Sequence, residues 1–293
     1  MHFKKVKGIL STKNGMNLSR GCIHGCIYCD SRSRCYNIDH DFEDVEIKIN
    51  APQLLEANLR SKRRRCMIGT GAMSDPYIPI EESLANTRAC LEIIEKYGFG
   101  LSILTKSNLI LRDLDILMSI HRKAKCVVAM TLTTFDENLC TIIEPNVCTS
   151  RERFETLTTL RDVGIKTVVW LCPLLPFIND TAENLRGILD YCIEAKVKGI
   201  LCFAIGMTLR EGNREYFYQK LDLHFPGLRA QYEKKYDSSY AITSDNNKKL
   251  MAYFHNICKE NDIMSDTGKV FEFMHTFDEK SVNRQLELFA HML

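Results

Sequence analysis

Long apolar runs are missing from this 293-residue sequence. The most apolar run, residues 167–178, is too short to span a bilayer and contains Pro173 and Pro176. Residues 1–5 lead into no apolar segment of the kind found in signal peptides. We therefore expect a soluble, cytoplasmic protein that does not bind a membrane.

The sequence also lacks an excess of charge of either sign. It has 39 Lys and Arg against 37 Asp and Glu, a net charge of +2. This overall charge gives no indication that the protein binds a polyanion. Low-complexity segments and sequence repeats are absent as well. Thirteen cysteines, an odd number without the spacing of a disulfide framework, favour a reducing environment. The hydrophobic fraction of 45% is ordinary for a globular protein and suffices for a sizeable core.

Three of the cysteines, Cys22, Cys26 and Cys29, form the pattern C-x3-C-x2-C. Gly21 and Gly25 allow the chain between them to loop tightly. Cysteine thiolates hold iron–sulfur clusters, and a cluster of four irons normally takes four of them. Three ligands would leave one iron open for a substrate or a second cofactor. The pattern therefore predicts a reactive iron–sulfur site.

Two other interpretations of the same cysteines stay open. One is a zinc knuckle that uses Cys35 as a fourth ligand, and the other is a set of unrelated core thiols. Zinc sites usually pair C-x2-C with a second pair further along the chain, and no such pair is visible. We favour the cluster and keep a non-catalytic iron–sulfur or zinc protein as the alternative.

Strand-like and helix-like segments alternate through most of the chain. The six predicted strands span residues 16–19, 66–70, 99–105, 125–131, 166–172 and 198–205. Predicted helices lie between them at residues 52–62, 81–96 and 112–122, behind the capping-box pair Thr149 and Glu152, and from residue 180. Six such units predict the α/β class, with a parallel sheet and right-handed crossovers.

Several polar or reactive residues stand at the carboxyl ends of these strands. The cysteine loop, Ser74, Lys106, Thr131 and Pro173 all fall there, at the edge where parallel barrels carry their active sites. After the sixth strand the pattern becomes helical and rich in aromatic residues. We therefore predict two units, a barrel over residues 1–206 and a helical C-terminal extension over residues 207–293 that caps it.

The cysteine loop, with Tyr28 directly before its third cysteine, resembles the signature of the radical S-adenosylmethionine (SAM) enzymes. The resemblance implies a partial (β/α)6 barrel of the TIM type. It implies that Cys22, Cys26 and Cys29 hold a [4Fe–4S] cluster whose fourth iron binds SAM, with Tyr28 near the adenosyl group. Reductive cleavage would then give a 5′-deoxyadenosyl radical that abstracts hydrogen from a substrate. The implied partner is an electron donor such as flavodoxin or ferredoxin.

Later segments are similar to the spore photoproduct lyase-related group of that superfamily. They are residues 70–77 (TGAMSDPY), 104–107 (LTKS), 144–154 with Glu144-Pro145 and Arg153-Phe154, and 173–180. By position, the resemblance implies that Ser74 and Lys106 contact the methionyl end of SAM and that Thr131 reaches the ribose. It also implies that Arg153 helps to hold the carboxylate. A lysine suits a carboxylate because it is a compact cation on a flexible stem.

Spore photoproduct lyases repair a thymine–thymine adduct in DNA, so the resemblance implies a nucleic acid or nucleotide as substrate. A peptide or small molecule is the rival, because the chain has no charge footprint for DNA. In those lyases a cysteine two residues before the position of Ser74 returns a hydrogen atom to the product. Here that position is Ala72, so we expect SAM cleavage with little or no repair of this lesion. Other thiols near the rim are Cys148 and Cys202, and our two candidate donors are Cys140 and Cys172.

Overall fold

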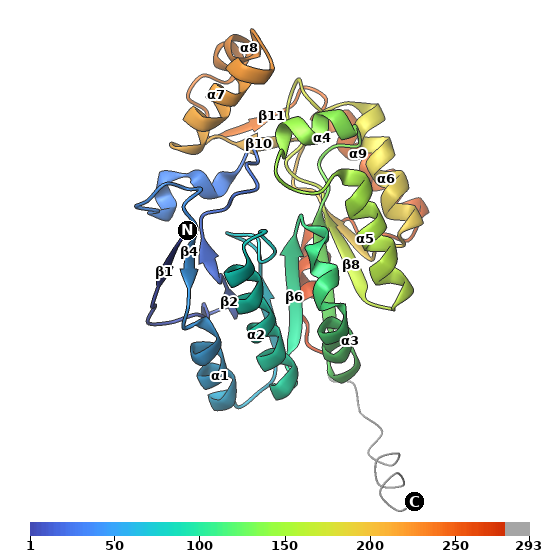
Figure 1. Ribbon diagram of the computed structural model, residues 1–293. Coiled ribbons are helices and arrows are strands. Elements are labelled where there is room, and N and C mark those ends of the chain that lie inside the picture. Colours follow the sequence, from blue (N-terminus) through green and yellow to red (C-terminus); the bar gives the residue numbers. More distant parts are fainter. Residues whose placement is uncertain (279–293) are drawn as a thin grey trace, which may run out of the picture.

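A computed structural model describes residues 1–278 of the chain (Figure 1). Its centre is a six-stranded sheet in the order β2-β5-β6-β7-β8-β9, with every neighbouring pair parallel. The predicted parallel α/β sheet is therefore confirmed. Its strands are β2 (Gly15–Met16), β5 (Met67–Thr70), β6 (Gly100–Thr105), β7 (Cys126–Thr131), β8 (Lys166–Trp170) and β9 (Gly199–Leu201).

Helices cover the outer face of this sheet (Figure 1). They are α1 (Ala51–Ser61), α2 (Glu81–Tyr97), α3 (Leu114–Lys123), α5 (Ser150–Asp162) and α6 (Ala182–Glu194), whereas the short α4 (Glu137–Ile143) lies beyond the carboxyl ends of the strands. A 3₁₀ helix, η3 (Asn108–Asp113), precedes α3, so the helix predicted from residue 112 begins later. At the start of α5 the Thr149 hydroxyl accepts from the Glu152 N–H and the Glu152 carboxylate accepts from the Thr149 N–H, the capping box that the sequence predicts.

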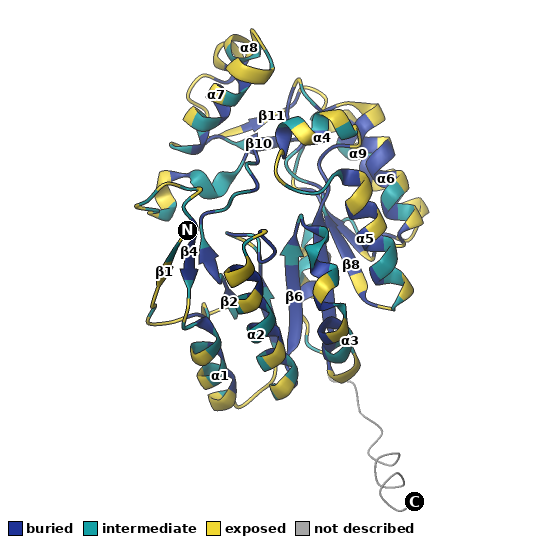
Figure 2. Ribbon diagram, viewed as in Figure 1, coloured by how far each residue is buried: buried dark blue, intermediate teal, exposed yellow. Residues whose placement is uncertain are grey.

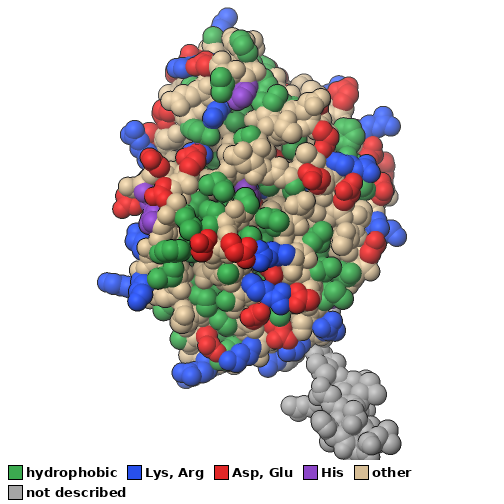
Figure 3. All heavy atoms as spheres, viewed as in Figure 1, with side chains coloured by type: hydrophobic (Ala, Val, Ile, Leu, Met, Phe, Trp, Pro, Cys, Tyr) green, Lys and Arg blue, Asp and Glu red, His purple; other side chains and the backbone are tan. Residues whose placement is uncertain are grey.

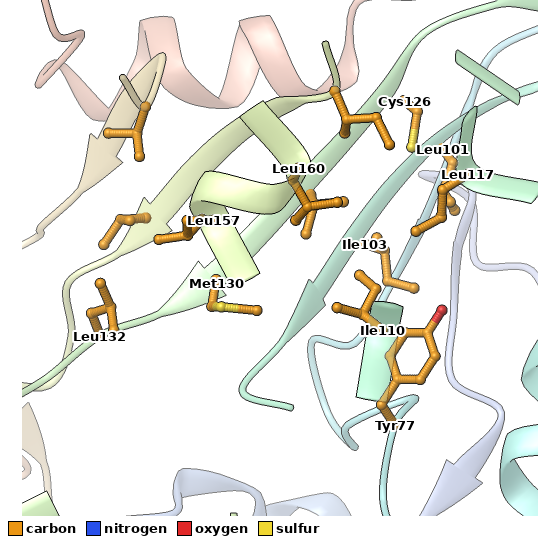
Figure 4. Close-up of a cluster of buried hydrophobic side chains, with 14 of the residues drawn as sticks. Tyr77, Leu101, Ile103, Ile110, Leu117, Cys126, Met130, Leu132, Leu157 and Leu160 are labelled. Carbon is orange, nitrogen blue, oxygen red and sulfur yellow. The ribbon is translucent and has the colours of Figure 1, made fainter. Parts of the chain in front are cut away.

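The core lies on both faces of the sheet, and β7 shows why. Its residues Cys126, Val128 and Met130 belong to the cluster beneath the outer helices, whereas Val127 and Ala129 belong to a second cluster on the other face. Figure 4 shows the first cluster, in which Met130 faces Leu157 of α5. Strands buried on both faces read as continuous apolar runs, which is how they appear in this sequence. Figure 2 shows the same strands as buried.

The second face is filled by α10 (Thr267–His275), which contacts both β5 and β9. Three other strands separate these two in the sheet order, so one helix can touch both only if the sheet is strongly curved. The sheet therefore has the form of a partial barrel with α10 in its concave side. α9 (Asn247–Glu260) lies beside α6 and completes the outer layer.

Two small sheets were missed by the sequence analysis. β1 (His2–Lys4), β4 (Glu46–Lys48) and β3 (Ser19–Arg20) form one, which carries the cysteine loop and its short 3₁₀ turns η1 (Asp30–Arg32) and η2 (Arg34–Tyr36). β10 (Gly206–Thr208) and β11 (Ala241–Thr243) form the other. Strands of two or three residues are too short to show a periodic pattern, so the sequence could not reveal them.

The part of the chain after β9 divides between two places. α7 (Asn213–His224) and α8 (Leu228–Tyr236) lie with β10 and β11 beyond the carboxyl ends of the strands, whereas α9 and α10 pack on the barrel (Figure 1). The extension is thus helical with one added pair of antiparallel strands, and its residues 279–293 lie outside the described part. The division at residues 206 and 207 stays a prediction.

Within residues 1–278, no helix has the length and apolar character needed to cross a membrane. Positive and negative side chains are interspersed over the face seen in Figure 3. This mixture agrees with the near balance of charge in the sequence.

Candidate active site

A cavity of about 540 Å³ opens at the carboxyl end of the central sheet, within the usual size range of ligand sites. Most of the residues that the sequence singled out line it. They are Cys22, Cys26, Tyr28, Cys29, Ala72, Ser74, Lys106, Thr131, Cys172 and Pro173. Arg153 and Cys140 are buried outside this wall, and Cys148 and Cys202 do not line it either. Folding therefore brings the rim positions of several strands to one place.

The cysteine loop turns sharply at Gly21 and Gly25, which both have positive φ angles. A Cβ atom at Gly21 would lie 2.4 Å from the carbonyl oxygen of Phe42, so only glycine fits there. The same oxygen accepts a hydrogen bond of 2.9 Å from the Cys22 N–H. Further along, the Ile27 N–H donates to the Ile143 carbonyl at 3.0 Å. These backbone bonds fix the loop with its thiols at the cavity.

The thiols suit a metal centre better than a nucleophile's role. Burial raises the pKa of Cys22 to about 12 and raises the pKa of Cys26 well above its usual range. A buried thiol of this kind reacts poorly, because the thiolate is the nucleophilic form. Coordination to a metal deprotonates a thiol outright. Three thiols on one cavity therefore fit the ligand set of an iron–sulfur cluster.

Lys106 follows β6 and adds a positive charge to the cavity wall. Burial lowers its pKa, but the nearby Cys26, Glu144 and Asp75 raise it by more, so the net pKa lies above the usual range. Its Nζ lies 5.8 Å from the ring centroid of Tyr28. Lys106 is thus a permanent cation facing the cavity, which suits a carboxylate of a bound ligand.

Two further polar residues of the wall, His24 and Asp75, were not assigned a role from the sequence. Asp75 accepts hydrogen bonds from the Lys106 N–H (2.8 Å), the Thr105 hydroxyl (2.7 Å) and the Tyr77 N–H (2.9 Å). His24 Nδ1 lies 3.6 Å from Asp75 Oδ2. The sequence pointed to them only indirectly, because His24 lies in the cysteine loop and Asp75 in the SDPY segment. Neither segment indicates that the two side chains lie close together.

Ser74 and Thr131 line the cavity, but the Ser74 hydroxyl and the Thr131 backbone carbonyl already form hydrogen bonds within the protein. The Ser74 hydroxyl donates to the Gly21 carbonyl at 2.7 Å and shares a 2.7 Å hydrogen bond with the Ser19 hydroxyl. The backbone carbonyl of Thr131 accepts from Arg153 at 3.1 Å. Ser74 therefore ties the cysteine loop to the strand edge. The predicted contacts of both residues with SAM stay predictions.

Tyr28 leads to a buried ion pair behind the cavity wall. Its hydroxyl donates to the Glu144 carboxylate, which pairs with Arg153 at 2.5 Å, and both charged side chains are fully buried. The Arg153 guanidinium also donates to the carbonyls of Cys148 and Thr131. All three of its nitrogens are occupied in this way. Arg153 thus braces the wall from behind, and its predicted contact with the carboxylate of SAM stays a prediction.

The opposite wall is mainly apolar. Trp170 and Phe203 contact each other there edge to face with a centroid distance of 5.9 Å, and Met207 and Ile242 continue the surface. Arg210 lies at the same end, where its Nη1 donates to the Tyr36 hydroxyl at 2.7 Å. These residues come from β8, from the segments after β9 and β10, and from the paired strands β10 and β11, and the sequence analysis missed them. The cavity therefore has a polar half at the cysteine loop and a mainly apolar half opposite it.

Comparison with known proteins gives a consistent result. Residues 16–192 match the family model described as the radical SAM superfamily. An uncharacterised protein of Methanocaldococcus jannaschii is 30% identical over 87% of this chain and 89% of its own. An uncharacterised protein of Mycobacterium tuberculosis is 30% identical over 75% of this chain. This match spans 66% of the mycobacterial protein, slightly less than two thirds of its length.

Solved structures of spore photoproduct lyase share the fold. A mutant with bound AdoMet and dinucleoside spore photoproduct aligns with a TM-score of 0.62 and 13% identity, over 88% of this chain and 80% of the lyase chain. A second mutant aligns with a TM-score of 0.62 and 12% identity, over 89% and 79%. At such identities the likeness concerns the fold alone. The family model, however, covers more than half of the sequence and includes the three cysteines at the cavity, so this chain belongs to the radical SAM superfamily of enzymes.

Proposed function

We propose that this protein cleaves SAM reductively at a [4Fe–4S] cluster and uses the 5′-deoxyadenosyl radical to abstract hydrogen from a substrate. In this proposal Cys22, Cys26 and Cys29 hold the cluster, and Lys106 pairs with the carboxylate of SAM. The apolar wall at Trp170 and Phe203 excludes water and receives the substrate.

One observation carries the proposal. The three thiols, the Lys106 ammonium and the His24 ring line the same cavity, at the end of a parallel sheet where α/β enzymes place their chemistry. The cysteine loop is also tightly packed, because a side chain at Gly21 would collide with the Phe42 carbonyl. This packing holds the three thiols in place for an iron–sulfur cluster. A zinc knuckle would need Cys35 as its fourth ligand. That residue is exposed and does not line the cavity, so the cluster is the better fit.

Anaerobic reconstitution with iron and sulfide, followed by SAM and a reductant, tests this directly. We expect a brown protein with about four irons per chain, the content of one cluster. With reductant present it should release 5′-deoxyadenosine. A preparation that retains one zinc per chain and never binds iron would rule out the proposed function.

Lys106→Ala is expected to weaken SAM binding by about 1.5–3 kcal/mol, the range for hydrogen bonds to charged groups. Cluster assembly should not change, because the thiols belong to a separate loop. An anaerobic titration of SAM into variant and parent proteins of equal iron content measures the difference. Equal affinities would remove Lys106 from the cofactor site.

A further prediction concerns the fate of the product radical. Of the four thiols considered as hydrogen donors, only Cys172 lines the cavity, whereas Cys140 is buried beside Glu144. Burial raises the pKa of Cys172, so the thiol keeps the hydrogen that a donor must supply. Its position beyond β8 differs from that of Ala72 after β5, which is where the lyases carry their donor.

We therefore expect reconstituted enzyme to cleave SAM but to convert little or no dinucleoside spore photoproduct. The measurement is chromatography of the lesion after incubation with enzyme, SAM and reductant. Many turnovers to thymidylyl-thymidine would contradict the prediction. Repair that appears only in Ala72→Cys would show that the donor alone was missing, and the matched variant Ala204→Cys, at another wall position, should not acquire it.

A further inference from the structure

A second cavity, of about 420 Å³, lies beside the N-terminal sheet of β1, β4 and β3. It adjoins the candidate active site, because Met73 lines both cavities and Ser19 on its wall shares a hydrogen bond with Ser74 of the active site. The proposed function gives this second cavity no role. Four charged side chains line it, which are Lys4, Arg20, Glu46 and Lys48.

The alternation of side chains along the strands brings these charges together. In β4, Glu46 and Lys48 point to the same face, whereas Ile47 between them packs in an apolar cluster on the other face. The register pairs Lys4 with Lys48 across β1 and β4. It pairs Arg20 with Glu46 across β3 and β4, and side chains of paired residues share a face. One face of the sheet therefore presents three cations and one carboxylate to the cavity.

Two of the three cations have no carboxylate partner. Lys4 Nζ donates to Glu46 Oε2 at 2.6 Å, so these two charges offset each other. In the described part of the chain, Arg20 and Lys48 form no ion pair, and the side chain of each donates one hydrogen bond of 2.7 Å to a backbone carbonyl. A guanidinium has five N–H groups and an ammonium has three. Most of these donors therefore have no protein partner.

The two unpaired cations indicate what kind of ligand the wall favours. Burial, and then the charge of Arg20, lowers the pKa of Lys48, and a bound anion would offset both charges. Together they match a phosphomonoester, which carries about −1.5 to −2 charges near neutral pH. Arginine and lysine are also common ligands of phosphate oxygens. Val6 and Ile38 add apolar surface to the wall, which suits an organic group attached to the phosphate.

We propose that this second cavity binds an organic phosphomonoester, with the phosphate held by Arg20 and Lys48. The inference goes beyond SAM cleavage and does not depend on it, because neither of these side chains lines the candidate active site. Phenyl phosphate is a suitable probe, since it joins a phosphate to an apolar ring. Phenyl sulfate is the matched control ligand, because it has the same shape and only one negative charge.

Calorimetric titration at about pH 8, where phenyl phosphate is a dianion, tests the proposal. We expect the parent protein to bind phenyl phosphate at least about tenfold more tightly than phenyl sulfate. Arg20→Gln and Lys48→Met should each weaken the binding of phenyl phosphate by about tenfold or more, because each removes a charged donor. Arg20→Lys keeps the charge without the planar fork and should recover part of the affinity.

Lys5→Met is the matched control variant, because Lys5 is an exposed cation next to β1 that does not line the cavity. It should bind phenyl phosphate like the parent. Circular dichroism and iron content show which variants keep the fold and the cysteine loop, and one folded variant of Arg20 or Lys48 is enough for the comparison.

Three results would overturn the inference. They are no binding of phenyl phosphate by the parent, equal affinity for phenyl phosphate and phenyl sulfate, and an equal loss in Lys5→Met and the cavity variants. The last would reveal a general attraction to basic surface. Undiminished binding in a folded Arg20→Gln or Lys48→Met protein would overturn it as well. Failure of the parent to bind iron or to cleave SAM would instead refute the proposed function and leave this site unaffected.

Discussion

Replacing any one of Cys22, Cys26 and Cys29 with alanine should abolish both bound iron and SAM cleavage. The loop supplies only three thiolates, so one iron of the proposed cluster has no protein ligand. We expect that a cluster left with only two thiolates does not stay bound. Each single variant should therefore behave alike after anaerobic reconstitution. Iron analysis, the visible spectrum and the yield of 5′-deoxyadenosine measure the three effects.

Cys35→Ala is the matched control, because Cys35 lies near the same loop but is exposed and outside the cavity wall. Its thiol has one neighbour of note, Arg210 Nη1 at 3.5 Å. We expect iron content and SAM cleavage like those of the parent. Loss of the metal in this variant as well would favour the four-cysteine zinc site and contradict the cluster.

Arg153→Met is expected to destabilise the protein by about 3–5 kcal/mol, the usual cost of breaking a buried ion pair by removing one partner. Glu144 would keep its charge in a fully buried position, with the Tyr28 and Thr133 hydroxyls and the Cys140 thiol as its remaining hydrogen-bond partners. The carbonyls of Cys148 and Thr131 would also lose their donor. Chemical denaturation followed by circular dichroism gives the change in unfolding free energy.

Arg151 in the same helix offers a matched control. It forms an exposed pair with Glu155 at 3.1 Å, so Arg151→Met should change the stability little. Combining Arg153→Met with Glu144→Gln should cost less than the sum of the two single changes, because the double variant leaves no buried charge without a partner. Equal effects at Arg151 and Arg153 would show that the buried pair does not brace the cavity wall.

The cysteine loop could be predicted from the sequence because its geometry is local. Only two or three residues separate Cys22, Cys26 and Cys29, so the covalent chain alone keeps their thiols within reach of one cluster. Lys106 and Thr131 could be placed at the rim for a related reason. They end apolar strands, and parallel strands in such a fold present their carboxyl ends at one edge.

Arg153 shows what local sequence patterns cannot predict. Its spacing from Arg151 places the two on different faces of α5, but helical periodicity does not say what each face meets. Only the packing of the loop after α4 against α5 puts Glu144 beside Arg153, where the two form a buried ion pair. Two arginines that look alike in the sequence therefore have different roles.

The sequence by itself determined the cysteine loop, the parallel α/β sheet and the edge at which the site lies, because bonded spacing and strand polarity act over short distances. The tertiary structure decided that His24 meets Asp75, that Trp170 and Phe203 close the far wall, and that α10 fills the curved sheet. These contacts join segments that are distant in the chain. They depend on how the strands curve and how the helices pack, which no short stretch of residues specifies.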